Sequence, residues 1–421
     1  IYGCRELIDH VGQYKDLKFP AQLTDAPEMV LRGGCVGIQK MEYLPGRGVY
    51  EYPYTPESFP WFYDKEQWIK YLDMLVENRM NSLYLWNGHP FASLVKLEEY
   101  PFAVEVDEET FKKNEEMFSF LTAEADKRGI FVIQMFYNIL LSKPFAEHYG
   151  LKTQDRNRPI TPLVSDYTRK SVAAFIEKYP NVGLLVCLGE AMDTYEDDVE
   201  WFTKTIIPGV KDGLKALGRT DEPPILLRAH DTDCKMVMDA ALPLYKNLYT
   251  MHKYNGESLT TYEPRGPWSK IHSDLSDLGS IHISNVHILA NLEPWRWGSP
   301  DFVQKAVNAM GPMLCICIRR LLIGTGRTRR TNWRMANGSI SWTVTGYGTR
   351  RGDAMHGTVI GTVHPKWNIG TSSWAIIMVR LLPKPEIFWR HTSRVERLLR
   401  SCSAVSASRK GTGRLCCWGC L

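Results

Sequence analysis

Seven short, continuous apolar runs recur along the first 293 residues of the chain, and helical segments lie between them. The runs do not alternate with polar residues, as expected of strands that are buried on both faces of a parallel sheet. They occupy residues 33–39, 81–88, 129–138, 181–190, 223–231, 248–257 and 281–293. This pattern predicts an α/β fold, because parallel strands need a crossover segment between each pair.

The segments between the runs carry the signals of amphipathic helices. Asp64 is the expected N-cap of one helix, and Asp107 begins another that stops at Gly129. Further helical segments occupy residues 166–180, 195–218 and 299–310. Repeated strand–helix units predict a (β/α)8 TIM barrel with the eighth unit missing. An open doubly wound sheet is the alternative, but the first run, RGGCVGIQ, lacks the Gly-rich phosphate turn of that fold.

The barrel is expected to span residues 31–310, and residues 1–30 are expected to be the end of a small α/β lead-in domain. The chain begins with Ile1 and shows no signal peptide, so we expect it to start inside a longer protein. No stretch approaches the ~18 consecutive apolar residues of a membrane helix. The barrel region has widely spaced cysteines and neither an H-E-x-x-H nor a C-x-x-C motif, which predicts no metal and no cofactor.

The chain changes character near Gly311. Residues 312–421 hold 18 Lys and Arg against 3 Asp and Glu, whereas residues 1–311 hold 33 against 44. Plausible codons can be assigned to residues 315–331. When these codons are read one base earlier, they encode an aromatic run, Tyr-Trp-Asp-Trp-Pro-Tyr. We therefore interpret residues 311–421 as a frame-shifted, poorly ordered tail in place of the eighth unit, and expect weak or no activity. A genuine basic extension that binds nucleic acid is the alternative, but it contains no recognisable binding motif.

The ends of the expected strands are polar, and barrels carry their chemistry at the C-terminal strand ends. Glu190 ends the fourth run and Glu293 ends the seventh. Two carboxylates across the barrel mouth suit glycoside hydrolysis, with one as proton donor and the other as nucleophile or base. The candidates for sugar binding at the same ends are Trp86, Asn87, His89, Asn138, Arg228, His230, Asp231, His252, Lys253, Tyr254 and Trp295.

Four segments, LRGGCVGIQ, NRMNSLYLWNGHPF, LLVCLGEAMD and HILANLEP, resemble bacterial polysaccharide-degrading glycoside hydrolases. The layout is similar to that of the α-glucuronidase and β-N-acetylhexosaminidase families, over roughly residues 2–310. The resemblance implies that Arg32 on the first strand binds sugar, that Glu190 is the proton donor and that Glu293 is the nucleophile or base. Gly189 stands where hexosaminidases carry the Asp of an Asp-Glu pair, which argues against their substrate-assisted mechanism.

The resemblance also implies a carbohydrate partner, rather than nucleic acid or a membrane, and a periplasmic or secreted location. The alternative function is a non-catalytic barrel that binds carbohydrate without cleaving it. Hydrolysis of a chromogenic glycoside, compared with a Glu190→Gln variant, distinguishes the two functions.

Overall fold

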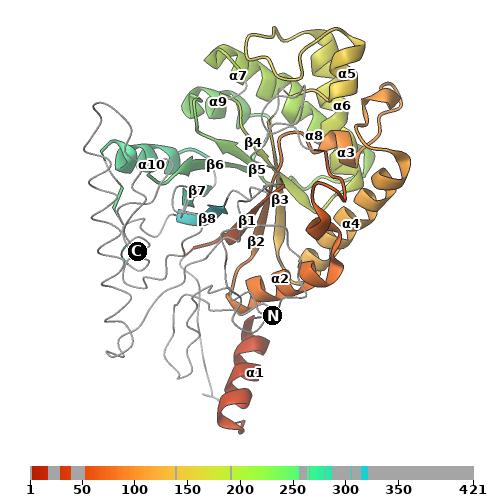
Figure 1. Cartoon of the computed structure of the whole chain (residues 1–421). Coiled ribbons are helices and arrows are strands. Elements are labelled where there is room, and N and C mark those ends of the chain that lie inside the picture. The colour runs from red at the N-terminus through yellow and green to blue at the C-terminus, as the bar shows by residue number, and fades with distance from the viewer. Residues whose placement is uncertain are drawn as a thin grey trace, which may run out of the picture.

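The chain forms a closed barrel of eight parallel strands that follow one another in sequence order (Figure 1). The computed structural model describes residues 2–17, 29–38, 53–137, 140–189, 192–255, 263–264, 266–279, 281–286, 305 and 314–320. The strands are β1 (Arg32–Gly37), β2 (Ser82–Trp86), β3 (Phe131–Phe136), β4 (Val182–Val186), β5 (Ile225–Arg228), β6 (Leu248–Lys253), β7 (Ile281–Val286) and β8 (Leu314–Arg320). The predicted barrel fold is therefore confirmed.

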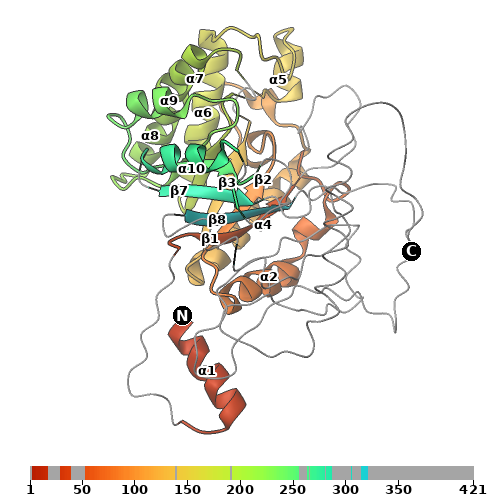
Figure 2. The same cartoon turned by 90° about the vertical axis from the view of Figure 1, so that its left-hand side faces the viewer.

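Helices lie outside the strands in both views of the molecule (Figures 1 and 2). They are α1 (Tyr2–Tyr14), α2 (Lys65–Glu77), α3 (Phe91–Leu94), α4 (Glu108–Lys127), α5 (Lys143–His148), α6 (Pro162–Lys178), α7 (Tyr195–Trp201), α8 (Ile207–Ala216), α9 (Cys234–Ala241) and α10 (Trp268–Ser276). Helix α1 precedes the barrel and extends away from it beside α2. Within the described residues, no helix is both long and apolar enough to cross a membrane.

The apolar core has two layers, because successive side chains of a strand point to opposite faces of the sheet. One layer fills the barrel interior and includes Tyr84, Ile133, Met251 and Ile283. The other lies between the strands and the helices, and it contains the intervening strand residues together with the apolar faces of the helices. The alternation therefore decides which strand residues reach the interior.

The expected helix boundaries are found where capping residues mark them. The side chain of Asp64 accepts a hydrogen bond from the backbone N–H of Gln67, and Asp107 accepts one from that of Thr110. Gly129 follows α4 with a φ of +67°, a conformation that glycine adopts without strain. The expected helix 195–218 is instead interrupted by a π-helical segment (Phe202–Ile206). This segment ends two positions before Pro208, whose ring nitrogen cannot donate to the helix.

The eighth barrel unit was expected to be missing, but the structure contains its strand. Strand β8 pairs with β7 on one side and with β1 on the other, and thereby closes the barrel. Its sequence, LCICIRR, contains two β-branched isoleucines, which favour extended backbone even though the surrounding composition has changed. Among the described residues, the eighth unit consists of this strand alone, and the rest of the tail lies outside them.

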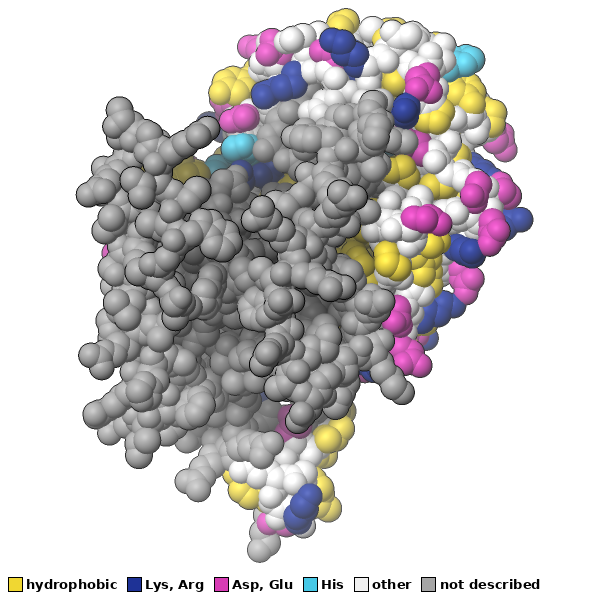
Figure 3. All heavy atoms as spheres, viewed as in Figure 1, with side chains coloured by type: hydrophobic (Ala, Val, Ile, Leu, Met, Phe, Trp, Pro, Cys, Tyr) yellow, Lys and Arg dark blue, Asp and Glu magenta, His cyan; other side chains and the backbone are white. Residues whose placement is uncertain are grey.

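The described surface carries interspersed acidic and basic side chains (Figure 3). Several of them form ion pairs one helical turn apart, such as Lys113 with Glu109 and Lys235 with Asp239. Exposed pairs of this kind contribute only about 0.3–0.5 kcal/mol each. The stability of the fold therefore rests on the two apolar layers rather than on these pairs.

Candidate active site at the barrel mouth

Two buried cationic side chains lie at the C-terminal end of the barrel interior. Arg228 is the last residue of β5 and Lys253 the last of β6, and both are less than 10% exposed. Each follows an interior residue, Leu226 or Met251, by two positions, so strand alternation directs both side chains inward. Both residues were expected at the mouth from the sequence, and the structure places them there together.

Arg228 is held by aromatic and sulfur contacts. Its guanidinium carbon lies 5.1 Å from the centre of the Trp86 ring, and its Nη1 donates to Cys187 Sγ at 3.6 Å. Trp86 in turn meets Tyr137 edge to face, with ring centres 6.2 Å apart. A cation over a desolvated indole ring is stabilised by about 2 kcal/mol. Trp86 was expected to stack on sugar. In the structure, one face of its ring is covered by the Arg228 guanidinium, which it stabilises.

The electrostatic character of the described mouth is positive. None of the inward-facing strand residues among those that the structure describes carries a carboxylate, whereas Arg228 and Lys253 are both basic residues. The described part of the mouth is therefore lined by basic and apolar side chains.

The turn after β4 is tightly held on both sides of the position where Glu190 stands in the sequence. The Arg156 guanidinium donates to the carbonyl oxygen of Gly189 at 2.6 Å and lies 3.4 Å from that of Met192. The backbone N–H of Gly189 donates to Thr232 Oγ1 at 3.0 Å. Arg156 belongs to the connection between α5 and α6, so two neighbouring segments hold this turn in place.

Gly189 has no room for a side chain. A Cβ atom there would lie 1.7 Å from the carbonyl oxygen of Asp231, which itself has a φ of +53°. Both features are unusual for ordinary side chains and indicate a close approach between the segments after β4 and β5. An Asp at this position, as in the hexosaminidase pair, is sterically excluded.

His230 and Asp231 lie at the rim rather than inside the barrel. His230 Nε2 and Asp231 Oδ2 are 4.0 Å apart, and the two side chains are about one third and one half exposed. They follow the end of β5, so they flank the mouth without filling it.

Three other predicted ligands contact protein groups outside the barrel interior. The Asn87 amide donates to the carbonyl oxygen of Ile38 and accepts from the backbone N–H of His89, and it thereby joins the segments after β1 and β2. His89 Nε2 lies 3.0 Å from the hydroxyl of Tyr167 on α6. Tyr254 is buried beside His272 of α10, with ring centres 5.6 Å apart. These contacts join neighbouring segments of the fold, and the role of the three residues as sugar ligands stays a prediction.

His252 faces the helix layer, because it precedes the inward-facing Lys253 by one position. Its ring lies 4.9 Å from the ring of Trp268 on α10. Burial lowers the pKa of His252 to about 4, so the ring is neutral at physiological pH. Its expected role in the mouth is replaced by packing against α10.

Arg32 lies at the opposite end of the barrel from the candidate site. It is the first residue of β1, and its guanidinium donates to the carbonyl oxygens of Arg79, Met29 and Val30. These carbonyls belong to the turns that enter β1 and β2. The role that the family resemblance implied for Arg32 is therefore not supported by its position, and Arg32 instead joins these turns.

Four expected site residues lie outside the described residues: Glu190, Asn138, Glu293 and Trp295. Sequence reasoning also missed two residues that the structure places at the site. Asn285 is the last inward-facing residue described on β7, and Arg156 holds the turn after β4. Strand alternation signals Asn285, since it follows Ile281 and Ile283 at even spacing, whereas no local pattern identifies Arg156.

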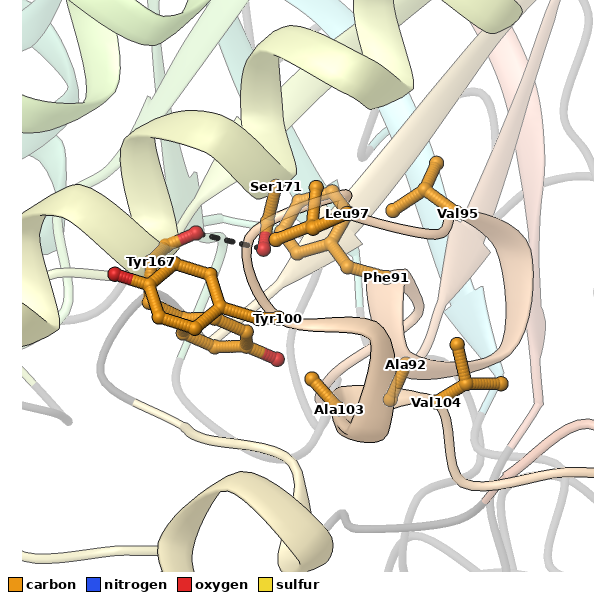
Figure 4. A pocket seen from close by; sticks show the side chains of 9 residues that line it. All are labelled: Phe91, Ala92, Val95, Leu97, Tyr100, Ala103, Val104, Tyr167 and Ser171. Carbon is orange, nitrogen blue, oxygen red and sulfur yellow. Dashed lines mark hydrogen bonds between the residues drawn. The ribbon is translucent and has the colours of Figure 1, made fainter. Parts of the chain in front are cut away.

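Two further polar or hollow features lie away from the barrel interior. A small pocket beneath the connection that follows β2 is lined mainly by apolar side chains, and Ser171 donates there to the carbonyl oxygen of Tyr167 (Figure 4).

On α7, burial raises the pKa of Asp198 to about 7, and the nearby Asp197 adds to this effect. No three His, Cys, Asp or Glu side chains of the described part are grouped as metal ligands would be.

No protein-family model matches the chain, and no curated protein matches it. Among solved structures, it is similar to a GH138 enzyme targeting pectin rhamnogalacturonan II, at 82% identity and a TM-score of 0.73. The similarity covers 75% of this chain and 37% of that enzyme, so the chain spans well under half of the enzyme's length.

More distant likenesses include a GH20 β-N-acetylhexosaminidase from Streptomyces coelicolor (13% identity, TM-score 0.37, 71% of this chain and 61% of that one). Another is a family 5 glycoside hydrolase from Prevotella bryantii (10% identity, TM-score 0.40, 71% and 90%). Likenesses of this degree carry no functional information. The expected resemblance to a polysaccharide-degrading glycoside hydrolase is confirmed. Over the aligned part, the chain and the GH138 enzyme have the same residue at 82% of positions.

Proposed function

We propose that this chain is the barrel region of a glycoside hydrolase that cleaves a glycosidic bond in pectic polysaccharide. The observation that carries the proposal is the 82% identity to a GH138 enzyme targeting pectin rhamnogalacturonan II. The aligned part covers 75% of this chain, and the mouth of a barrel is where it acts on its substrate.

The charge of the described mouth supports an acidic sugar as the substrate. Rhamnogalacturonans contain galacturonate units, which carry a carboxylate at neutral pH. Arg228 and Lys253 face the barrel interior from adjacent strands, where desolvation strengthens their attraction for such a group. In this proposal the two cations hold the uronate carboxylate, and Trp86 keeps the guanidinium in place.

The proposed chemistry uses two carboxylates, neither of which lies within the described residues. Glu190 protonates the glycosidic oxygen as the bond breaks, and Glu293 acts as nucleophile or as the base that activates water. The contacts of Arg156 and Thr232 to Gly189 support the role of Glu190, because they hold the residue that precedes it in the sequence. A general acid must be held in position to donate its proton to the leaving oxygen.

A non-catalytic carbohydrate-binding barrel is the alternative. The decisive experiment measures release of reducing sugar from rhamnogalacturonan II by a frame-restored chain and by its Glu190→Gln variant. Hydrolysis that the variant loses, with binding retained, supports the proposed function. Binding without hydrolysis by both proteins supports the alternative.

We also propose that the chain has three parts. Residues 1–30 form a lead-in and residues 31–310 the first seven barrel units. Residues 311–421 are a frame-shifted tail, which begins with the strand β8 that closes the barrel. The 75% of the chain that aligns with the GH138 enzyme is close to the share that precedes Pro312, which supports this division. Independent sequencing reads of the gene that show an intact frame encoding this tail would contradict it. A polysaccharide substrate also supports a periplasmic or secreted location, which cell fractionation tests.

A further inference from the structure

Asn285 lies inside the barrel at the level of the cationic side chains. It follows Ile283 by two positions on β7, and Ile283 belongs to the interior layer. Its register partner on β6 is Lys253. The residue is 1% exposed, so its side-chain amide is removed from bulk water.

The side-chain amide of Asn285 is poorly satisfied by the protein. Its Nδ2 donates to the thioether sulfur of Met251 at 3.7 Å, and a thioether is a weak acceptor. Its Oδ1 has no hydrogen-bond partner among the described residues. A buried polar atom left without a partner lowers the stability of the fold. The backbone of Asn285 is satisfied, since its carbonyl oxygen accepts from the N–H of Tyr254 at 2.9 Å.

An apolar side chain of the same size would avoid this cost, so the amide requires an explanation other than folding. We propose that Asn285 is a substrate-binding residue that recognises a hydroxyl group of the sugar held in the mouth. Its Oδ1 accepts a hydrogen bond from the hydroxyl, and its Nδ2 donates to the oxygen of the same or the adjacent hydroxyl. This inference rests on the proposed function, because it assigns the ligand of the mouth to carbohydrate.

The neighbouring residues divide the recognition of the sugar between them. Lys253 and Arg228 attract its carboxylate, whereas Asn285 is neutral and selects a group that both donates and accepts hydrogen bonds. Sites built to hydrogen-bond a hydroxyl reject analogues without it, because the buried partner is then left unsatisfied. Asn285 therefore contributes to specificity for the sugar as well as to affinity.

Ser284 provides a matched control on the same strand. Its hydroxyl is also buried and without a hydrogen-bond partner among the described residues, at 0% exposure. It precedes Asn285 by one position, so it faces the helix layer rather than the barrel interior. A Ser284→Ala variant removes an equivalent unsatisfied group from a place that no substrate reaches.

The experiment compares the frame-restored chain with its Asn285→Leu and Ser284→Ala variants. Urea unfolding gives the stability, and isothermal titration calorimetry gives the affinity for rhamnogalacturonan II oligosaccharides. We expect Asn285→Leu to unfold at the same or a higher urea concentration and to bind about five- to ten-fold more weakly. Ser284→Ala is expected to bind as the unchanged chain does.

Either of two results with Asn285→Leu would overturn the inference: unchanged affinity, or a lower unfolding midpoint, which would assign the amide to folding. The failure of the proposed function gives a different result. If the frame-restored chain without substitutions binds the oligosaccharides but does not hydrolyse them, the enzymatic proposal fails while the affinities still decide the role of Asn285. If the unchanged chain binds no oligosaccharide, both proposals are overturned.

Discussion

Three buried histidines between the barrel and α10 predict a steep loss of stability in acid. His282 Nε2 lies 2.8 Å from His272 Nδ1, and the His272 ring is 6.1 Å from that of His252. Burial is the largest cause that lowers the pKa of all three, to about 4 for His252 and about 3 for His282. The groups that face them are Tyr254, Thr250, Trp268, His230 and Arg228.

The sign follows from proton binding in the two states. In the unfolded chain each imidazole has a pKa near 6.5, so below that pH the unfolded state binds more protons than the folded state and stability falls. The loss begins near pH 6.5 and continues down to the folded pKa. At about 1.4 kcal/mol per pH unit for each group, His252 and His282 together remove about 7 kcal/mol between pH 6.5 and 4. That is comparable to the whole stability of a typical domain.

The assay is urea unfolding followed by tryptophan fluorescence at several pH values between 7.5 and 4.5. His252→Gln and His282→Gln are each expected to reduce the dependence of the unfolding free energy on pH by about 1.4 kcal/mol per unit near pH 5. His148→Gln is the control, because His148 is exposed at the end of α5. A pH dependence that stays the same in all three variants would refute the assignment of acid sensitivity to the buried cluster.

Two further predictions concern strained or unsatisfied positions. Gly189→Ala places a Cβ against the Asp231 carbonyl and should destabilise the chain by about 1–3 kcal/mol in urea unfolding. Gly12→Ala on α1, with open space around it, should not destabilise, and equal effects would contradict the steric argument. Asp198→Asn should raise the unfolding free energy at pH 8 by about 2 kcal/mol, because the buried carboxylate has a pKa of about 7 and no hydrogen-bond partner among the described residues. This gain should shrink towards pH 5, where the folded carboxyl is protonated; a gain independent of pH would contradict the ionisation argument.

The sequence predicted the barrel and several of its boundaries because both depend on local patterns. Asp64 and Asp107 cap the helices that they were expected to begin, since the cap is formed by residues three positions apart. Arg228 and Lys253 were expected at the mouth because they end apolar runs, and the structure places them there. The β8 strand was not expected, because its isoleucines stand within a segment of altered composition.

The orientation of individual side chains was less predictable. His252 and Lys253 are neighbours in the sequence, yet one meets α10 and the other faces the interior, which depends on the phase of the strand within the barrel. Arg32 was assigned to the site from the family resemblance, whereas β1 begins at this residue and so places it at the far end. The contacts of Arg156 to the turn after β4 join segments more than 30 residues apart and leave no signal in the local sequence.

The central claim is that the barrel mouth hydrolyses a glycosidic bond in an acidic pectic polysaccharide. Its most direct test measures reducing-sugar release from rhamnogalacturonan II by the frame-restored chain, alongside its Glu190→Gln and Arg228→Ala variants. We expect hydrolysis by the first protein, at least a 100-fold lower kcat for Glu190→Gln, on the order expected for loss of a general acid, and a raised KM for Arg228→Ala. Hydrolysis at equal rates by all three proteins would refute the proposed function.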